Sequence, residues 1–172
     1  MTVYCVGMTT SANGAAARNR ERKFDSPEQE AFLNLWRTYD RLRAVEDELF
    51  GRYDLTAQQY NALRLLRGEH PGALATLALA GRLVSRAPDI TRLVDHLEKR
   101  GLAERERLLA NRRVVLVRIT AAGLKLLKEL DREVRECHAM QLGHLRPAEL
   151  KSLIWLLRAA RRPHEETGGI WE

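Results

Sequence analysis

One stretch of the sequence, residues 82–120, constrains the fold more than any other. It runs RLVSRAPDITRLVDHLEKRGLAERERLLANRRVVLVRIT. Its first part places apolar residues at the spacing of one helix face, namely Ile90, Leu93, Val94 and Leu97. The pattern predicts a helix over residues 88–100 that ends at Gly101, because glycine readily takes the positive φ of a helix end. The pattern that follows predicts a two-stranded hairpin with arginines at its tip, and then the start of another helix.

The predicted helix carries a polar face opposite its apolar face. At 100° per residue, four residues point away from the apolar stripe: Pro88, Arg92, Asp95 and Lys99. Residues 82–113 hold nine Lys or Arg and five Asp or Glu, a local net charge of +4 in a chain of net charge +6. A polar helix face followed by a basic hairpin is typical of proteins that bind duplex DNA, although a charged stretch also occurs on a plainly solvated face.

The composition is that of a globular protein. Of the 172 residues, 45% are hydrophobic and 30% are charged, so a single domain with its own core is expected. No apolar run approaches the roughly 20 residues that a membrane span requires. The two cysteines, Cys5 and Cys137, form neither a disulfide framework nor a metal-ligand spacing, so we expect a cytoplasmic protein without cofactor or metal.

The sequence offers no convergent polar cluster of the kind that an enzyme needs. Cys137 and His138 are neighbours, and adjacent residues on a helix point about 100° apart, so they are poorly placed to act as nucleophile and base. The five histidines show no metal-ligand spacing. We therefore expect a protein that is not an enzyme.

Helices are predicted on both sides of the central stretch. The first begins at Ser26, which is followed by proline and acidic residues. A capping box at Thr56 begins a second helix, and a short helix is expected from about residue 74 to residue 83. After the hairpin, Thr120 caps a long helix, and Pro147 begins the last one. The first helix and the last two carry apolar stripes, and a two-fold dimer is the commonest way to cover such surfaces.

Three runs in the central stretch recur in a known order and spacing: DITRLVDHLEKRGLAER, NRRVVLVRIT and AAG. In these runs the chain resembles the MarR family of winged helix-turn-helix transcriptional regulators, over roughly residues 30–160. The resemblance implies a homodimer with interlocked outer helices and two winged-helix lobes. It also implies that the helix over residues 88–100 enters the major groove of DNA, and that the hairpin reaches into the minor groove.

The resemblance also assigns roles to single residues. Pro88 and Arg92 match positions that face base edges, and Arg113 matches an arginine that enters the minor groove. Two positions depart from the family pattern, since Asn111 replaces an aspartate that would hold the hairpin by an ion pair, and Asp89 replaces a small hydroxyl residue. A carboxylate at position 89 repels phosphate, but it can accept a hydrogen bond from cytosine N4.

Several residues around this helix have more than one interpretation. Arg92 is expected to contact a base or a phosphate, but it could instead pair with Asp89 or Asp95 on a solvated surface. Thr91 and His96 lie at the sides of the polar face, where a DNA contact and a structural role are equally open. The candidate DNA-binding residues are Arg86, Pro88, Asp89, Thr91, Arg92, Asp95, His96, Arg112 and Arg113.

We therefore expect a mainly α fold with a small β-wing, in which a winged helix-turn-helix (residues 55–120, approximately) is flanked by dimerisation helices. Those helices are expected at about residues 28–50 and 121–165, within a single domain of residues 26–172. Residues 1–25 are expected to form a disordered basic tail.

The function expected of this fold is that of a homodimeric repressor that binds double-stranded DNA at an inverted-repeat operator. The resemblance adds release by a small aromatic or anionic effector, for which Trp36 and Tyr39 are the candidate contacts, although aromatic residues at helical spacing more often form a core. The alternative is a winged-helix protein-interaction module without DNA binding. Such a module should carry a neutral or acidic helix and wing, and the local charge of +4 argues against it.

Overall fold

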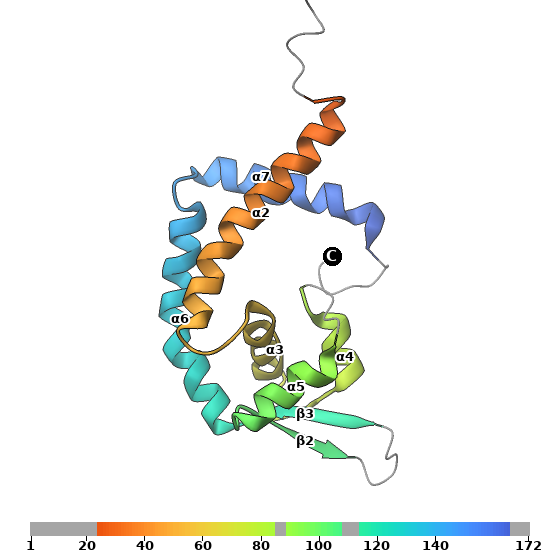
Figure 1. Cartoon of the computed structure of the whole chain (residues 1–172), viewed down its shortest axis with the longest axis vertical. Coiled ribbons are helices and arrows are strands. Elements are labelled where there is room, and N and C mark those ends of the chain that lie inside the picture. The colour runs from red at the N-terminus through yellow and green to blue at the C-terminus, as the bar shows by residue number, and fades with distance from the viewer. Residues whose placement is uncertain (1–23, 85–88, 108–113, 166–172) are drawn as a thin grey trace, which may run out of the picture. The chain divides into compact units, whose positions relative to one another are not determined.

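A computed structural model describes residues 24–84, 89–107 and 114–165 (Figure 1). The chain divides into two compact units, Met1–Arg41 and Leu42–Glu172. Helix α2 (Pro27–Gly51) begins in the first unit and ends in the second. The expected tail with Cys5 falls almost entirely on residues outside the described ranges.

The second unit contains the remaining helices and all the described strands. Its elements are α3 (Ala57–Gly68), β1 (Leu74–Ala75), α4 (Thr76–Arg82), α5 (Ile90–Lys99), β2 (Ala103–Arg107), β3 (Val115–Ile119), α6 (Ala121–Leu142), α7 (Pro147–Arg161) and the short 3₁₀ helix η1 (Arg162–His164). The expected fold class, mainly α with a small antiparallel wing, is confirmed. No helix in the described ranges is both long enough and apolar enough to cross a membrane.

The predicted helix ends are confirmed by their hydrogen bonds. Ser26 Oγ accepts from the backbone N–H of Gln29 at 3.1 Å, which caps α2. Thr56 forms the capping box of α3, and Thr120 Oγ1 accepts from the backbone N–H three residues on at 3.1 Å, which caps α6. Gly101 follows α5 with a φ of +67°, the left-handed conformation that glycine adopts without a Cβ clash.

The sheet has three strands in the order β1-β3-β2, all antiparallel. The predicted hairpin is present, but the prediction of a helix from about residue 74 is wrong at its start, because Leu74 and Ala75 form a strand and α4 begins only at Thr76. Leu74 lies opposite Val117, and both side chains are buried. This pairing over 43 positions of sequence outweighs the local helix propensity of an alanine- and leucine-rich run.

The core of the second unit lies between α3, α5, α6 and the sheet. The largest fully buried side chains there are Leu63, Leu66, Leu79, Leu97, Leu127, Leu130, Val94 and Val117. Helix α5 contributes its apolar stripe to this core, so its polar face is turned outward. Figure 1 shows α5 beside the β2–β3 hairpin, at the end of the second unit farthest from α7.

Candidate nucleic-acid interface

Helix α5 presents a polar surface whose start is fixed by Asp89. The Asp89 carboxylate accepts from the backbone N–H of Arg92 at 3.0 Å, so Asp89 is the N-cap and the helix begins one residue later, at Ile90. The predicted helix over residues 88–100 is therefore slightly shorter in the structure, with Arg100 as its C-cap. Arg92 stands on the outer face with 87% of its side chain exposed.

The structure resolves which acid Arg92 pairs with. Its Nε lies 3.0 Å from Asp89 Oδ2, and the two residues are three apart on the helix. Asp89 is 45% exposed, so solvent screens the pair and it contributes at most about 1 kcal/mol to folding. The Arg92 guanidinium thus remains at the surface, where it can also bind a second partner.

Asp95 has a different partner, which the sequence did not reveal. Arg105 of β2 contacts the Asp95 carboxylate, and its Nη1 lies 3.1 Å from Glu98 Oε2. Arg105 Nη2 also donates to the backbone carbonyl of Thr91 at 2.9 Å. Only 22% of the Arg105 side chain is exposed. Arg105 therefore fastens β2 to three successive turns of α5, and Asp95 faces the wing.

The alternation of charges in β2 explains how Arg105 reaches α5. In the sequence AERER, residues 104 and 106 point to the face opposite that of Arg105. There Glu104 lies 3.6 Å from Arg118 of β3, and Glu106 contacts the same guanidinium. One arginine thus ties the hairpin to α5 and another ties its two strands together. This AERER pattern is the signal from which Arg105 could have been identified.

A depression of about 640 Å³ lies between the start of α4, α5 and the hairpin. Arg107 at the end of β2 and Leu77, which is 84% exposed, stand at this surface. The residues that line it are Ala75, Thr76, Leu77, Thr91, Glu98, Arg105, Arg107, Val114 and Val115. It combines apolar and charged groups beside the polar face of α5.

The described ranges contain five of the nine candidate DNA-binding residues. Asp89, Thr91 and Arg92 are exposed, and of these three Arg92 was predicted to lie on the outer face of α5. Asp95 is partly buried against Arg105, and His96 is partly buried with its Nδ1 enclosed and without a hydrogen-bond partner among the described residues. The other four lie outside the described ranges, namely Arg86, Pro88, Arg112 and Arg113, as does Asn111.

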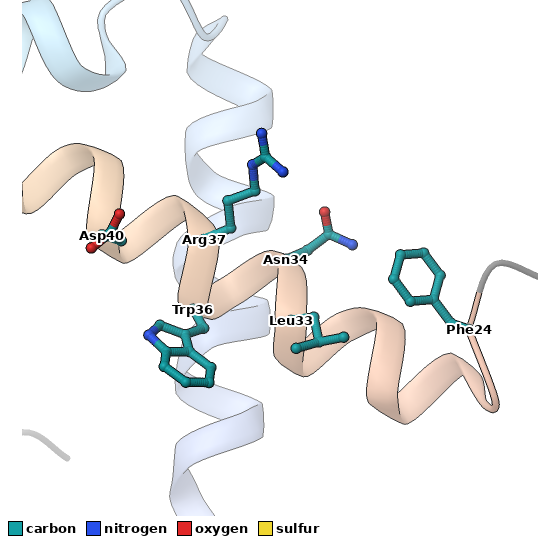
Figure 2. Close-up of a pocket in the computed structure, with 6 residues that line it drawn as sticks. All are labelled: Phe24, Leu33, Asn34, Trp36, Arg37 and Asp40. Carbon is teal, nitrogen blue, oxygen red and sulfur yellow. The ribbon is translucent and has the colours of Figure 1, made fainter.

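The candidate effector contacts lie on α2 in the first unit. Trp36 and Tyr39 are 62% and 57% exposed, so within the single chain they do not form a core. An open depression of about 560 Å³ is lined by Trp36 but not by Tyr39 (Figure 2). Its other lining residues are Phe24, Leu33, Asn34, Arg37 and Asp40. The structure thus brings only one of the two predicted aromatic residues to this depression.

Comparison with known proteins shows which family this winged-helix unit is similar to. A model of the MarR family matches residues 55–115, from the capping box of α3 to the start of β3. The crystal structure of a MarR transcription factor from Planctomyces limnophilus is 58% identical and matches 80% of this chain and 99% of that protein, with a TM-score of 0.64. Two further relatives are more distant.

The HTH-type transcriptional repressor NicR of Pseudomonas putida is 29% identical over 145 residues, which span 84% of this chain and 90% of the relative. BpsR of Bordetella bronchiseptica, whose DNA binding is regulated by 6-hydroxynicotinic acid, is 28% identical over 81% of this chain and 97% of its own, with a TM-score of 0.67. The relatives from Planctomyces limnophilus and Pseudomonas putida are transcription regulators rather than enzymes. Because a relative more than half identical is matched over almost its whole length, this chain belongs to the MarR family of transcriptional regulators.

Proposed function

We propose that the protein is a homodimeric transcriptional repressor that binds an inverted-repeat operator in duplex DNA. One observation carries the proposal: α5 turns Arg92 outward beside a hairpin that Arg105 fastens to the same helix. In this arrangement α5 enters the major groove and the hairpin lies over the minor groove. NicR, the relative from Pseudomonas putida, is itself a repressor.

The candidate residues divide by what they contact. Arg92 and Pro88 meet base edges in the major groove, and Arg112 and Arg113 enter the minor groove, where a narrow groove attracts a guanidinium. Arg86 meets a phosphate. Thr91, Asp89 and His96 stand at the edges of the contact. Asp95, held by Arg105, supports α5 from the side of the wing.

Assembly follows from apolar surface that the single chain leaves uncovered. Helix α7 exposes four large apolar side chains: Ile154, Trp155, Leu156 and Leu157. We assign the dimer contacts to about residues 28–50 and 121–165 of one domain over residues 26–172, with residues 1–25 as a basic tail. A protein of this kind acts on DNA in the cytoplasm.

Selection of bound sequences from random duplex DNA, with the full-length protein, tests this function. An enriched inverted repeat with half-sites about 34 Å apart is the expected result, since this is one helical turn of DNA. Failure to enrich any sequence, with a folded protein, would favour the alternative of a winged-helix interaction module.

Two arginine variants then separate the two grooves. Arg92→Ala should cost about 1–3 kcal/mol of binding and relax the preference at one position of each half-site. Arg113→Ala should weaken binding to many sequences, reduce the salt dependence and lower the preference for A·T-rich flanks. Arg64→Ala is the matched control, because Arg64 is exposed on α3 and belongs neither to the candidate DNA-binding residues nor to the proposed dimer helices.

Regulation by a small aromatic acid is a second part of the proposal. It is favoured by the similarity to BpsR, whose DNA binding responds to 6-hydroxynicotinic acid. A thermal-shift screen of phenolic and aromatic carboxylate compounds, with 6-hydroxynicotinic acid included, should find one that raises the melting temperature and weakens operator binding. Trp36→Ala and Tyr39→Ala should reduce both effects if these side chains hold the effector. A screen without any such compound would indicate regulation without an effector.

A further inference from the structure

The N-cap of α5 contains a contact that capping does not require. Both carboxylate oxygens of Asp89 bind the same residue, since Oδ1 accepts from the backbone N–H of Arg92 at 3.0 Å and Oδ2 lies 3.0 Å from Arg92 Nε. A cap needs only the first of these bonds, which a serine or threonine also makes. The second contact, between Asp89 Oδ2 and Arg92 Nε, holds the side chain that the proposed function assigns to the DNA bases.

The second bond limits what the Arg92 guanidinium can do. A guanidinium is a planar group with five N–H donors, and the donor on Nε is taken by Asp89. Among the described residues, the two terminal amino groups of Arg92 contact no acceptor. They remain as a two-pronged donor at the outer face of α5, on a side chain that is 87% exposed.

A donor pair of this geometry matches one base edge best. Guanine presents two acceptors, O6 and N7, in the major groove, whereas adenine presents one acceptor beside a donor. An arginine without Asp89 is free to turn toward phosphates and other acceptors, because its long side chain has many rotamers. An arginine held at Nε has lost part of this freedom before DNA arrives.

We propose that Asp89 is a positioning residue that orients Arg92 to bind guanine, and thereby determines the specificity of the operator contact. The inference rests on the proposed DNA-binding function and deepens it. It also accounts for a carboxylate close to a polyanion: Asp89 lowers the affinity for all DNA by repelling phosphate, and it raises the preference for one base over the others.

Two substitutions separate this role from capping. Asp89→Ser keeps a side-chain oxygen for the backbone N–H of Arg92 but leaves no second oxygen for Nε. Asp89→Asn keeps the shape and the cap, but turns an amide N–H₂ toward Nε, which is a donor facing a donor. Glu104→Gln is the matched control, because it removes one carboxylate from the neighbouring strand β2 without a contact to Arg92.

The experiment uses the full-length protein and the duplex obtained by selection. Arg92→Ala first identifies the base pair at which preference depends on Arg92. Titrations then compare duplexes with each of the four bases at that position, for the parent and for the variants, alone and combined with Arg92→Ala. Circular dichroism confirms that each variant keeps its helix content.

The Asp89 substitutions are expected to lower the preference for guanine and to raise the affinity for scrambled duplexes. The parent should prefer guanine at this position by about tenfold or more. Asp89→Ser and Asp89→Asn should each reduce that preference by at least about threefold, while they bind scrambled duplexes more tightly than the parent. Glu104→Gln should leave the preference unchanged. In the Arg92→Ala background, the Asp89 substitutions should no longer alter the base preference.

Other outcomes overturn the inference. A guanine preference that survives both Asp89 substitutions would leave Asp89 as a cap alone. A change in cytosine preference that persists without Arg92 would show that Asp89 contacts the base itself. A parent that prefers another base at this position would also overturn it. A parent that selects no sequence at all would count against the proposed function, a result that is distinct from these three.

Discussion

Arg92 and Arg105 show how the surroundings of a residue decide its role. Both are arginines paired with carboxylates at α5, yet 87% of the Arg92 side chain is exposed and only 22% of that of Arg105. Among the described residues, Arg92 has one acid partner, whereas Arg105 has two together with a backbone carbonyl. The terminal amino groups of Arg92 can therefore bind DNA while its Nε stays on Asp89, whereas Arg105 is part of the structure.

Cys137 is a residue whose chemistry is suppressed by its position. It is buried in α6, and burial, with a smaller contribution from the charge of Glu46, raises the pKa of its thiol. Since the thiolate is the reactive form, Cys137 in the folded protein should react slowly with thiol reagents at pH 8. The measurement uses a Cys5→Ser variant, so that one thiol remains. Fast labelling without denaturant would contradict this prediction.

The same pKa shift has a consequence for stability at alkaline pH. The folded thiol holds its proton to higher pH than the unfolded thiol, so the unfolded state loses its proton first above about pH 8.5. The contribution of Cys137 to stability is thus complete below this pH and declines as the pH rises above it. In the Cys5→Ser background, Cys137→Ala should flatten the fall in unfolding free energy that begins above about pH 8.5.

At the scale of the elements, local signals predicted where helices begin and end. Ser26, Thr56, Thr120 and Pro147 each begin a helix by a mechanism that involves only the next three or four residues, which is why sequence alone revealed them. The two-residue strand β1 escaped prediction because its partner in β3 lies far along the chain. The partners of Arg105 escaped for the same reason, since they depend on how β2 packs on α5.

The junction of α6 with the sheet depends on a glycine. A Cβ on Gly123 would lie 2.3 Å from the carbonyl oxygen of Leu102 and 2.7 Å from Ile119 Cγ1. Gly123→Ala should therefore destabilise the protein by about 1–3 kcal/mol, as the helix is forced away from the strands. Gly81→Ala in α4 is the matched control, because nothing lies within 4 Å of its Cβ position.

Urea unfolding followed by circular dichroism measures both glycine variants. Gly81→Ala should be neutral or stabilise by up to about 1 kcal/mol, because alanine is the better helix former. Equal effects of the two substitutions would contradict the tight approach at Gly123.

The attachment of the wing to α5 can be tested with two arginines of the same hairpin. Arg105→Met leaves Asp95 and Glu98 without their cation and should cost about 1–3 kcal/mol of stability. Arg118→Met affects the ion pairs of Arg118 at the surface of the hairpin and should cost less than about 1 kcal/mol.

Both substitutions remove one positive charge, so a difference in DNA binding between the two variants reflects geometry. Arg105→Met should weaken binding to all duplexes more than Arg118→Met, and equal losses would falsify this role of Arg105.

At the scale of the whole molecule, the fold class and the family were predictable, and the dimer is the prediction that remains. The amphipathic pattern of α5 and the charge of the hairpin depend on composition and spacing, which the sequence contains in full. An interface between two copies depends instead on surfaces that a single chain leaves open. In α7 these surfaces are apolar, and none of its described side chains is fully buried.

Trp155 is the side chain of α7 with the largest exposed fraction among its exposed apolar residues, at 66%. Because it is not part of the core of one chain, Trp155→Glu should leave the helix content intact but place a charge in the dimer contact. The variant should sediment as a monomer at micromolar concentration, where the parent sediments as a dimer. Its affinity for the full inverted repeat should fall to that for a single half-site, because the second half-site is no longer bound by the same assembly. Ala78→Glu adds the same charge at an exposed position of α4, outside the proposed dimer helices, and should remain a dimer. A folded parent that sediments as a monomer, or a Trp155→Glu variant that remains a dimer, would remove α7 from the interface.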